Sequence, residues 1–208
     1  MDQMPMFPLG TVLLPGERLP LQIFEPRYVA LVQACLAAPT GPEFGVVLIA
    51  RGHEVGGGEQ RTDLGTIARI DDCVSYSDSR YILRCTGTDR IRVQQWLPDD
   101  PYPRAEVQRW PAGTAVPSDA AVAEVLDRAE EIAALHSQLA KRAGQQIPRY
   151  SRPRPQKDGR IAYSLASQLP LSDADRQAVL AAADPEAQLL VLAAALDDVI
   201  AALRFRLL

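Results

Sequence analysis

The chain has 208 residues, of which 47% are hydrophobic and 23% charged, and this composition excludes a disordered protein. Its formal net charge of −4 gives no general attraction to nucleic acid or to anionic lipid. No apolar run approaches the roughly 20 residues that a membrane span requires.

The opening stretch, MFPLGTVLLPGERLPLQIF (residues 6–24), contains two short apolar runs divided by prolines. Proline is mostly restricted to strand edges and turns, so the pattern predicts two short strands. Residues 15–20, PGERLP, are expected to form the crossing between these two edge segments.

A single amphipathic helix is predicted to follow, beginning at Pro26, because proline suits the first helical position. Its apolar stripe has helical spacing and comprises Tyr28, Leu31, Val32, Cys35 and Leu36. Pro39, Gly41 and Pro42 are expected to end it.

Strand patterns dominate from there to residue 110. Residues 43–51 form a continuous apolar run, and 63–76 a longer candidate. Two alternating segments, 79–87 and 89–96, are predicted as separate strands joined tightly at Gly87, with a β-bulge as one form of this connection, and 102–110 alternates more weakly. In the second of them Ile91, Val93 and Gln95 share one face, with Arg90, Arg92 and Gln94 on the other. Short strands at this spacing predict a small barrel or curled sheet.

Helical periodicity begins at Ser118, which is a candidate N-cap. The segment SDAD (172–175) resembles a capping box, and Asp184 followed by Pro185 predicts another helix start. We therefore predict an α+β protein with two domains: a β domain, residues 1–112, and a helical bundle, residues 118–208, joined through 111–117.

In this order the sequence resembles the Lon protease N-terminal, substrate-binding domain family, as a stand-alone member. The resemblance is carried by Pro8-Leu9, Pro15-Gly16, Pro20-Leu21, the run Ile23–Tyr28, and the later Gly65-Thr66-Ile67-Ala68 with Gly87, Arg90 and Val93. The family implies a PUA-like β domain with one inserted helix, followed by a helical bundle. It also implies a module that binds unfolded or exposed polypeptide segments, in protein quality control or as an adaptor for a separate ATP-dependent protease.

The sequence lacks the motifs of a Lon-type enzyme. The phosphate-binding pattern G-x-x-x-x-G-K-[ST] does not occur, and no serine–lysine protease motif is recognised. No histidine or cysteine has metal-ligand spacing, so neither a metal nor a cofactor is expected. The acidic pairs Asp71-Asp72 and Asp99-Asp100 are interpreted as turn residues rather than as an acid–base pair. We therefore expect no enzymatic activity.

Three aromatic residues, Trp96, Tyr102 and Trp110, are the candidates for contact with polypeptide, because they lie near strand ends close to the domain junction. The alternative for these residues is a packed seam between the domains, since large aromatic side chains usually bury.

The segment 141–160 is rich in proline and positive charge, and it raises the alternative that the chain binds RNA through Arg149, Arg152 and Arg154. A solvated loop is the favoured interpretation, because the chain as a whole is acidic and Tyr150 is the one aromatic residue there. Finally, three well-separated cysteines and the absence of a secretory signal predict reduced thiols and a cytoplasmic location.

Overall fold

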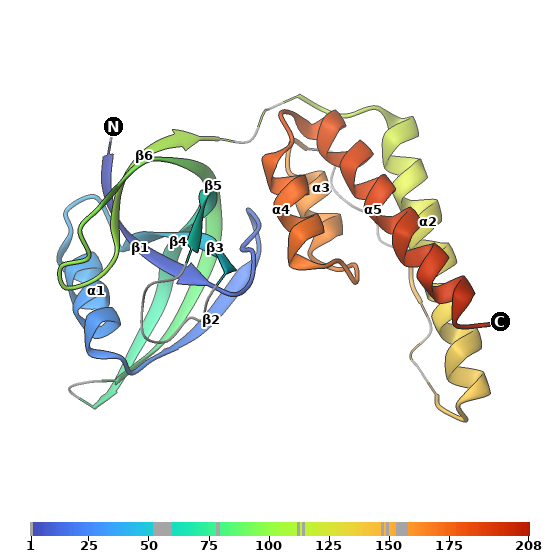
Figure 1. Cartoon of the computed structure of the whole chain (residues 1–208), viewed down its shortest axis with the longest axis horizontal. Helices are drawn as coiled ribbons and strands as arrows, with labels where there is room; N and C mark the ends of the chain where they lie inside the picture. The colour runs from blue at the N-terminus through green and yellow to red at the C-terminus, as the bar shows by residue number, and fades with distance from the viewer. Residues whose placement is uncertain are drawn as a thin grey trace. The chain divides into compact units, whose positions relative to one another are not determined.

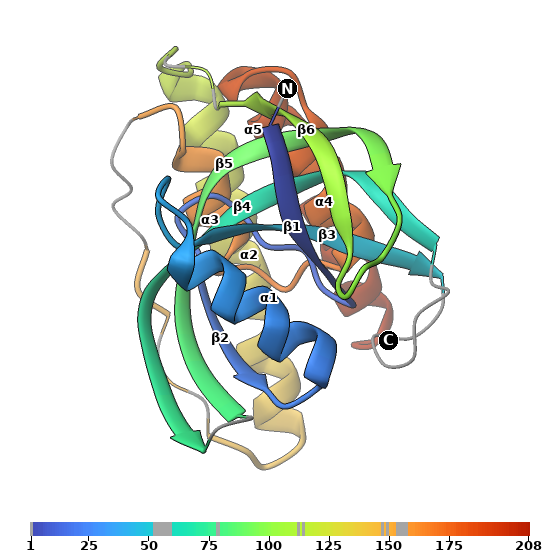
Figure 2. The same ribbon diagram turned by 90° about the vertical axis from the view of Figure 1, so that its left-hand side faces the viewer.

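In this computed structural model the described residues are 2–51, 60–77, 80–111, 113, 115–146, 148, 150–152 and 158–208. They form two compact units, Met1–Ala112 and Gly113–Leu208. The described part of the first unit holds strands β1–β6 and helix α1, and that of the second holds helices α2–α5 (Figures 1 and 2).

The β unit is built on one mixed sheet whose strands are ordered β2-β5-β4-β3-β1-β6. The strands are β1 Asp2–Leu9, β2 Arg18–Ile23, β3 Glu43–Arg51, β4 Gln60–Ser77, β5 Arg80–Leu97 and β6 Arg104–Trp110. β1 and β3 are parallel, and the other pairs are antiparallel. β6 also pairs with the second half of β5, so the sheet curls on itself. The predicted α+β class with a curled sheet is confirmed.

The prediction of two strands meeting at Gly87 was wrong, because β5 runs unbroken through this residue. An irregularity is nevertheless present there, because the register with β4 shifts between the pairs Thr66–Arg90 and Ala68–Gly87. The Gly87 N–H donates to the Glu17 carbonyl at 2.9 Å, and its own carbonyl accepts from Gly16 at 2.8 Å. A Cβ at position 87 would lie 2.4 Å from the Leu14 carbonyl oxygen. Glycine is therefore required here by the close approach of a second backbone segment, not by a turn.

That second segment is the connection between β1 and β2. Val12, Leu13 and Leu14 are buried, and the buried Thr66 hydroxyl donates to the Leu13 carbonyl at 2.6 Å. The prediction of two edge strands was correct for β2 and wrong for β1, because β1 pairs with both β6 and β3. The prolines thus shape a buried connection and one edge strand.

Helix α1, Pro26–Ala37, begins at the predicted proline and covers one face of the sheet (Figure 2). Tyr28 stacks on Phe7 of β1 with ring centroids 4.0 Å apart. Leu36, predicted in the apolar stripe, is 48% exposed, and Val29 is buried instead. The core under this helix also includes residues of β2, β3, β4 and β5.

The second unit consists of α2 Asp119–Arg142, α3 Ile161–Ala166, α4 Asp173–Ala181 and α5 Pro185–Phe205. The three predicted caps are present: Ser118 accepts from Ala121, Asp184 accepts from Ala187, and Ser172 and Asp175 form a reciprocal capping box. Each such cap contributes about 1 kcal/mol to helix stability.

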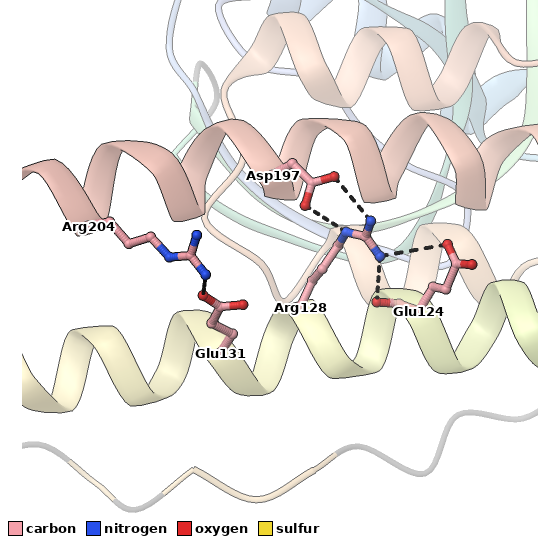
Figure 3. A network of polar contacts seen from close by, with 5 residues as sticks. All are labelled: Glu124, Arg128, Glu131, Asp197 and Arg204. Atoms are coloured by element: carbon pink, nitrogen blue, oxygen red, sulfur yellow. Dashed lines mark hydrogen bonds and ion pairs between the residues drawn. The ribbon is translucent and has the colours of Figure 1, made fainter.

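Helices α2 and α5 lie side by side and bury apolar stripes against each other (Figure 1). Their polar margin carries ion pairs (Figure 3): Arg128 binds Asp197 through two nitrogens at 2.8 and 3.1 Å, and Arg204 binds Glu131 at 2.6 Å. Exposed pairs of this kind contribute well under about 1 kcal/mol each, so apolar burial provides most of the stability. In the parts of the chain that the structure describes, no helix has both the length and the hydropathy of a membrane span.

Replacing Gly87 by Ala is expected to lower the free energy of unfolding by about 1–3 kcal/mol or more, because the new methyl group must displace the Leu14 carbonyl. Thr88→Ala serves as the control, because it removes only the 3.3 Å hydrogen bond from the Thr88 hydroxyl to the Ile67 carbonyl. Its free energy of unfolding should fall by less than about 1.5 kcal/mol. Urea denaturation midpoints measure both. Equal stability of Gly87→Ala and the native chain would contradict the close-approach explanation.

Candidate functional site

The three predicted aromatic residues lie in different environments, and each contacts its own β unit. Trp96 packs against the cluster built around Met6, Ile67 and Ile91, while Tyr102 packs against the separate cluster under α1. Trp110 ends β6. All three side chains are partly buried, and the structure does not place them in one shared cluster.

Polar contacts fix the orientation of Trp96. Its indole N–H donates to Asp63 at 3.3 Å, and the Arg61 guanidinium lies 4.8 Å from the ring centroid. Arg61 also forms a two-pronged ion pair with Asp99, at 2.7 and 3.1 Å. The acidic side chain of Asp99 is thus committed to a structural pair in the β unit.

Trp110 covers a buried charge. Arg90, predicted on the face away from Ile91 and Val93, is fully buried at 0% exposure. Its guanidinium carbon lies 3.7 Å from the Trp110 ring centroid, and that of Arg92 lies 3.9 Å away. Arg90 and Trp110 are direct partners across β5 and β6, so strand register produces the contact. A cation above an aromatic face is stabilised by the ring quadrupole, and more strongly when water is excluded.

The basic segment offers one described residue of the RNA alternative. Arg152 donates to Asp127 at 2.8 Å and to Glu130 at 2.7 Å, both on α2. Its charge is therefore balanced by two carboxylates, which hold the pKa of its guanidinium above the ordinary value. Arg149 and Arg154 lie outside the described residues.

Two of the cysteines are deeply buried thiols. Burial, helped by the nearby Glu43, raises the pKa of Cys35 to about 12, and burial also raises the pKa of Cys85 to about 12. Cys73 is partly buried, and desolvation raises its pKa as well. Thiolates are the reactive form of cysteine, so these environments oppose nucleophilic chemistry. Among the described residues, no three His, Cys, Asp or Glu side chains gather as a metal site would need.

A second candidate surface lies at the end of the sheet that β2 forms. Here β2, residues 71–77 of β4 and residues 80–86 of β5 form a three-stranded arm. One face of the arm packs against α1 through Leu19, Leu21, Ile23, Cys73, Tyr81, Leu83 and Cys85. Residues that alternate with these point to the opposite, outer face, because successive strand side chains point to opposite sides.

Four large apolar side chains of the arm and its margins remain exposed, and two of them are neighbours on its outer face. Val74 and Ile82 are direct register partners and are 51% and 44% exposed. Tyr76 follows two residues after Val74 and is 52% exposed, and Phe24 follows β2 directly and is 60% exposed. We call these four residues the outer apolar patch. Single exposed apolar residues are normal, but neighbouring ones on one surface are typical of interaction sites.

The remainder of the outer face is charged. Asp71 and Asp72, predicted as turn residues, lie within β4. Asp72 pairs with Arg84, and Asp71 accepts hydrogen bonds from Thr86 and Arg69. These two hydrogen bonds, that of Thr86 first, lower the pKa of the Asp71 carboxyl group. The outer apolar patch therefore adjoins a polar row that carries the carboxyl groups of Asp71 and Asp72 and the guanidinium groups of Arg69 and Arg84.

Alternation in the sequence was the signal that could have identified the patch. Between residues 73 and 83, apolar residues occupy both faces of two consecutive strands: Cys73 and Leu83 point inward, while Val74 and Ile82 point outward. A strand that is apolar on both faces is normally read as fully buried. Only the position of α1 reveals that one of these faces is uncovered in its own unit.

Comparison with known proteins gives a consistent result. The chain matches the family model of the ATP-dependent protease La (LON) substrate-binding domain over residues 3–198. It is 28% identical to Lon protease 2 of Sorangium cellulosum over 92% of this chain, and 35% identical to Lon protease 4 of the same organism over 70% of it. The chain spans only 24% and 16% of the length of these two relatives.

Two solved structures share the fold. The Lon N-terminal domain protein from Xanthomonas campestris is 29% identical, with a TM-score of 0.65 over 93% of this chain and 98% of that one. The N-terminal domain of a Mycobacterium avium complex Lon protease is 18% identical, with a TM-score of 0.60 over 95% of this chain and 99% of that one. The second similarity concerns the fold alone.

Trp110→Ala is expected to lower the free energy of unfolding by about 2–4 kcal/mol, because it removes two cation–π contacts and uncovers the buried Arg90. Trp110→Phe, which keeps an aromatic face, should lose less than half of that amount. Guanidinium chloride unfolding followed by circular dichroism measures both variants. If Trp110→Ala is as stable as the native chain, the ring is not structural and remains available for binding.

The thiols are expected to differ in reactivity. At pH 8 a thiol whose pKa is about 12 is ionised in only roughly one molecule in ten thousand, so Cys35 and Cys85 should resist iodoacetamide in the folded protein. Cys73 should be alkylated first. Peptide mass mapping over time, with a urea-unfolded sample as control, measures the three rates. Fast modification of Cys35 in the folded chain would contradict its buried position.

Proposed function

We propose that this chain, which belongs to the LON substrate-binding domain family, is a recognition module that binds unfolded polypeptide segments through the outer apolar patch of its β unit. The observation that carries the proposal is the exposure of Val74 and its register partner Ile82 on the outer face of the arm, with exposed Tyr76 and Phe24 at the ends of the neighbouring segments. Unfolded polypeptides expose apolar side chains that a folded protein buries, so an uncovered apolar surface distinguishes the two states.

The outer apolar patch supports this role better than Trp96, Tyr102 and Trp110. Trp96 and Trp110 are oriented by arginines of their own unit, and Tyr102 packs into the core under α1. Side chains that already have such contacts lose them if they turn toward a ligand. The four patch residues are exposed without such rearrangement, so binding adds contacts and removes none.

Recognition by this module is proposed to be non-enzymatic and to take place in the cytoplasm. The 208 residues contain no phosphate-binding loop, and the buried thiols of Cys35 and Cys85 are poor nucleophiles. In this proposal the chain acts as an adaptor that presents bound segments to an ATP-dependent protease. The RNA alternative gains no support from Arg152, because its guanidinium is occupied by Asp127 and Glu130.

The double variant Val74→Ser with Ile82→Ser is expected to weaken binding of reduced, carboxymethylated α-lactalbumin, a permanently unfolded polypeptide, by about tenfold or more. Its stability should change by less than about 1 kcal/mol, since both side chains are about half exposed. Leu190→Ser, at a residue that is 58% exposed on α5, is the matched control and should bind normally. Fluorescence anisotropy measures binding, and unchanged affinity of the double variant would remove the patch from the proposal.

A further inference from the structure

β2 is an edge strand with a regular, open side. It stands at one end of the strand order and pairs with β5 alone, in unbroken register from Arg18 to Ile23. The second half of β4 forms the other margin of the arm, but register shifts between Ile70 and Asp72 and between Ser75 and Ser77 interrupt it. Bulges of this kind twist an edge away from further pairing, so β2 presents the better template of the two.

The register identifies the backbone groups on the open side. Because the Gly87 N–H donates to Glu17, alternate residues from Glu17 onward direct their backbone groups toward β5. The intervening residues, Arg18, Pro20 and Gln22, therefore direct theirs outward. Proline lacks an N–H, and Pro20 occupies an outward position where the ladder with β5 loses nothing. The open side thus offers N–H groups at Arg18 and Gln22 and carbonyls at all three residues.

No backbone hydrogen bond from a described residue reaches these outward groups. The chemistry that pairs alternating N–H and C=O groups along a strand is a second extended backbone. The missing donor at Pro20 lowers the number of hydrogen bonds that a partner can form. Such an edge favours weak, reversible pairing rather than permanent association with another sheet.

The side chains along the edge define what the second strand carries. Leu19 and Leu21 are partly exposed above the core under α1, so apolar side chains of an added strand would cover them. On the outer face Arg18 and Pro20 line a hollow of about 590 Å³ that also includes Arg84 and Thr86. Its charged lining is three arginines, Arg18, Arg69 and Arg84, against one carboxylate, Asp71. Asp71 pairs with Arg69 and also interacts electrostatically with Arg18, so the hollow keeps an excess of positive charge. An acidic side chain on the outer face complements this charge.

From these observations we infer that polypeptide is bound as an added β-strand along the open side of β2, with alternating apolar side chains over Leu19 and Leu21 and an acidic side chain beside Arg18. This inference rests on the proposed function and specifies its mode and substrate class. Hydrogen bonds to the backbone provide affinity without regard to sequence, and the alternating side chains provide selection. The outer apolar patch extends the same contact surface beyond β2.

The test uses the whole chain and a short synthetic peptide that alternates valine with threonine and carries an aspartate near one end. Gln22→Pro removes the outward N–H, which β5 does not use, and is expected to weaken peptide binding by about tenfold or more. Gln22→Ala, which keeps the N–H, is the matched control and should stay within about twofold of the native affinity. Urea midpoints verify that both variants remain folded. Arg18→Ala should weaken binding of the aspartate peptide and not of an asparagine version.

A second test needs no protein variant. It compares two versions of the peptide, one N-methylated at the odd-numbered amides and the other at the even-numbered amides. Strand addition uses only one set, so one methylated peptide should lose binding and the other retain it. Equal binding of the two, or normal binding by a folded Gln22→Pro chain, would overturn strand addition.

The patch variant Val74→Ser with Ile82→Ser separates the two proposals. If it loses binding while Gln22→Pro binds normally, the proposed function stands and the strand mode fails. If neither folded variant loses binding, both fail. A concentration-dependent dimer that Gln22→Pro abolishes would assign the edge to a second copy of this chain and would overturn the polypeptide as its occupant.

Discussion

The close approach of the Leu14 carbonyl to Gly87 is the constraint on which the β unit depends. It allows the connection from β1 to β2 to cross β5 without a side chain between the two backbones. Because the crossing is tight, Val12, Leu13 and Leu14 are buried, and the Thr66 hydroxyl can satisfy the Leu13 carbonyl inside the core. β2 therefore lies at the end of the sheet. The first half of β5 pairs with β2, and the second half of β5 pairs with β6.

Continuity of β5 joins two environments within one strand. Its second half carries Arg90, which lies buried beneath Trp110, and belongs to the curled body of the sheet. Its first half projects into the arm, where α1 covers one face and leaves the other uncovered in its own unit. The arm can therefore remain folded through its inner face while its outer face stays available for a ligand. Exposed apolar surface is tolerated here because the opposite face already provides the burial that stabilises the strands.

In the helical unit, the capping residues that the sequence predicts and the packing between the helices agree. Capping groups satisfy the first amides of α2, α4 and α5, and the Ser118 backbone N–H and hydroxyl both donate to Glu186 of α5 at 2.7 Å. Within the core, Gln188 donates to the Tyr163 hydroxyl at 2.7 Å, which links α5 to α3 through a buried hydrogen bond. Exposed ion pairs between α2 and α5 add orientation more than stability.

The sequence by itself determined the elements whose signals are local. The caps at Ser118, Ser172 and Asp184, the helix beginning at Pro26 and the strand at residues 43–51 all depend on residues within a few positions of one another. The family resemblance and the α+β class with its curled sheet could also be predicted from the sequence. Both depend on proline spacing and on the alternation of apolar residues, which are local patterns.

Only the tertiary structure decided the features that depend on distant segments. Gly87 reads as a turn in the sequence, and only the Leu14 carbonyl explains why a strand needs glycine there. Arg90 reads as a solvent-facing residue, and only the register with β6 places Trp110 over it. Alternation divides residues into two faces but does not say which face is covered. The position of α1 settles that question, and it leaves Val74 and Ile82 exposed while Leu83, the next residue along β5, is buried.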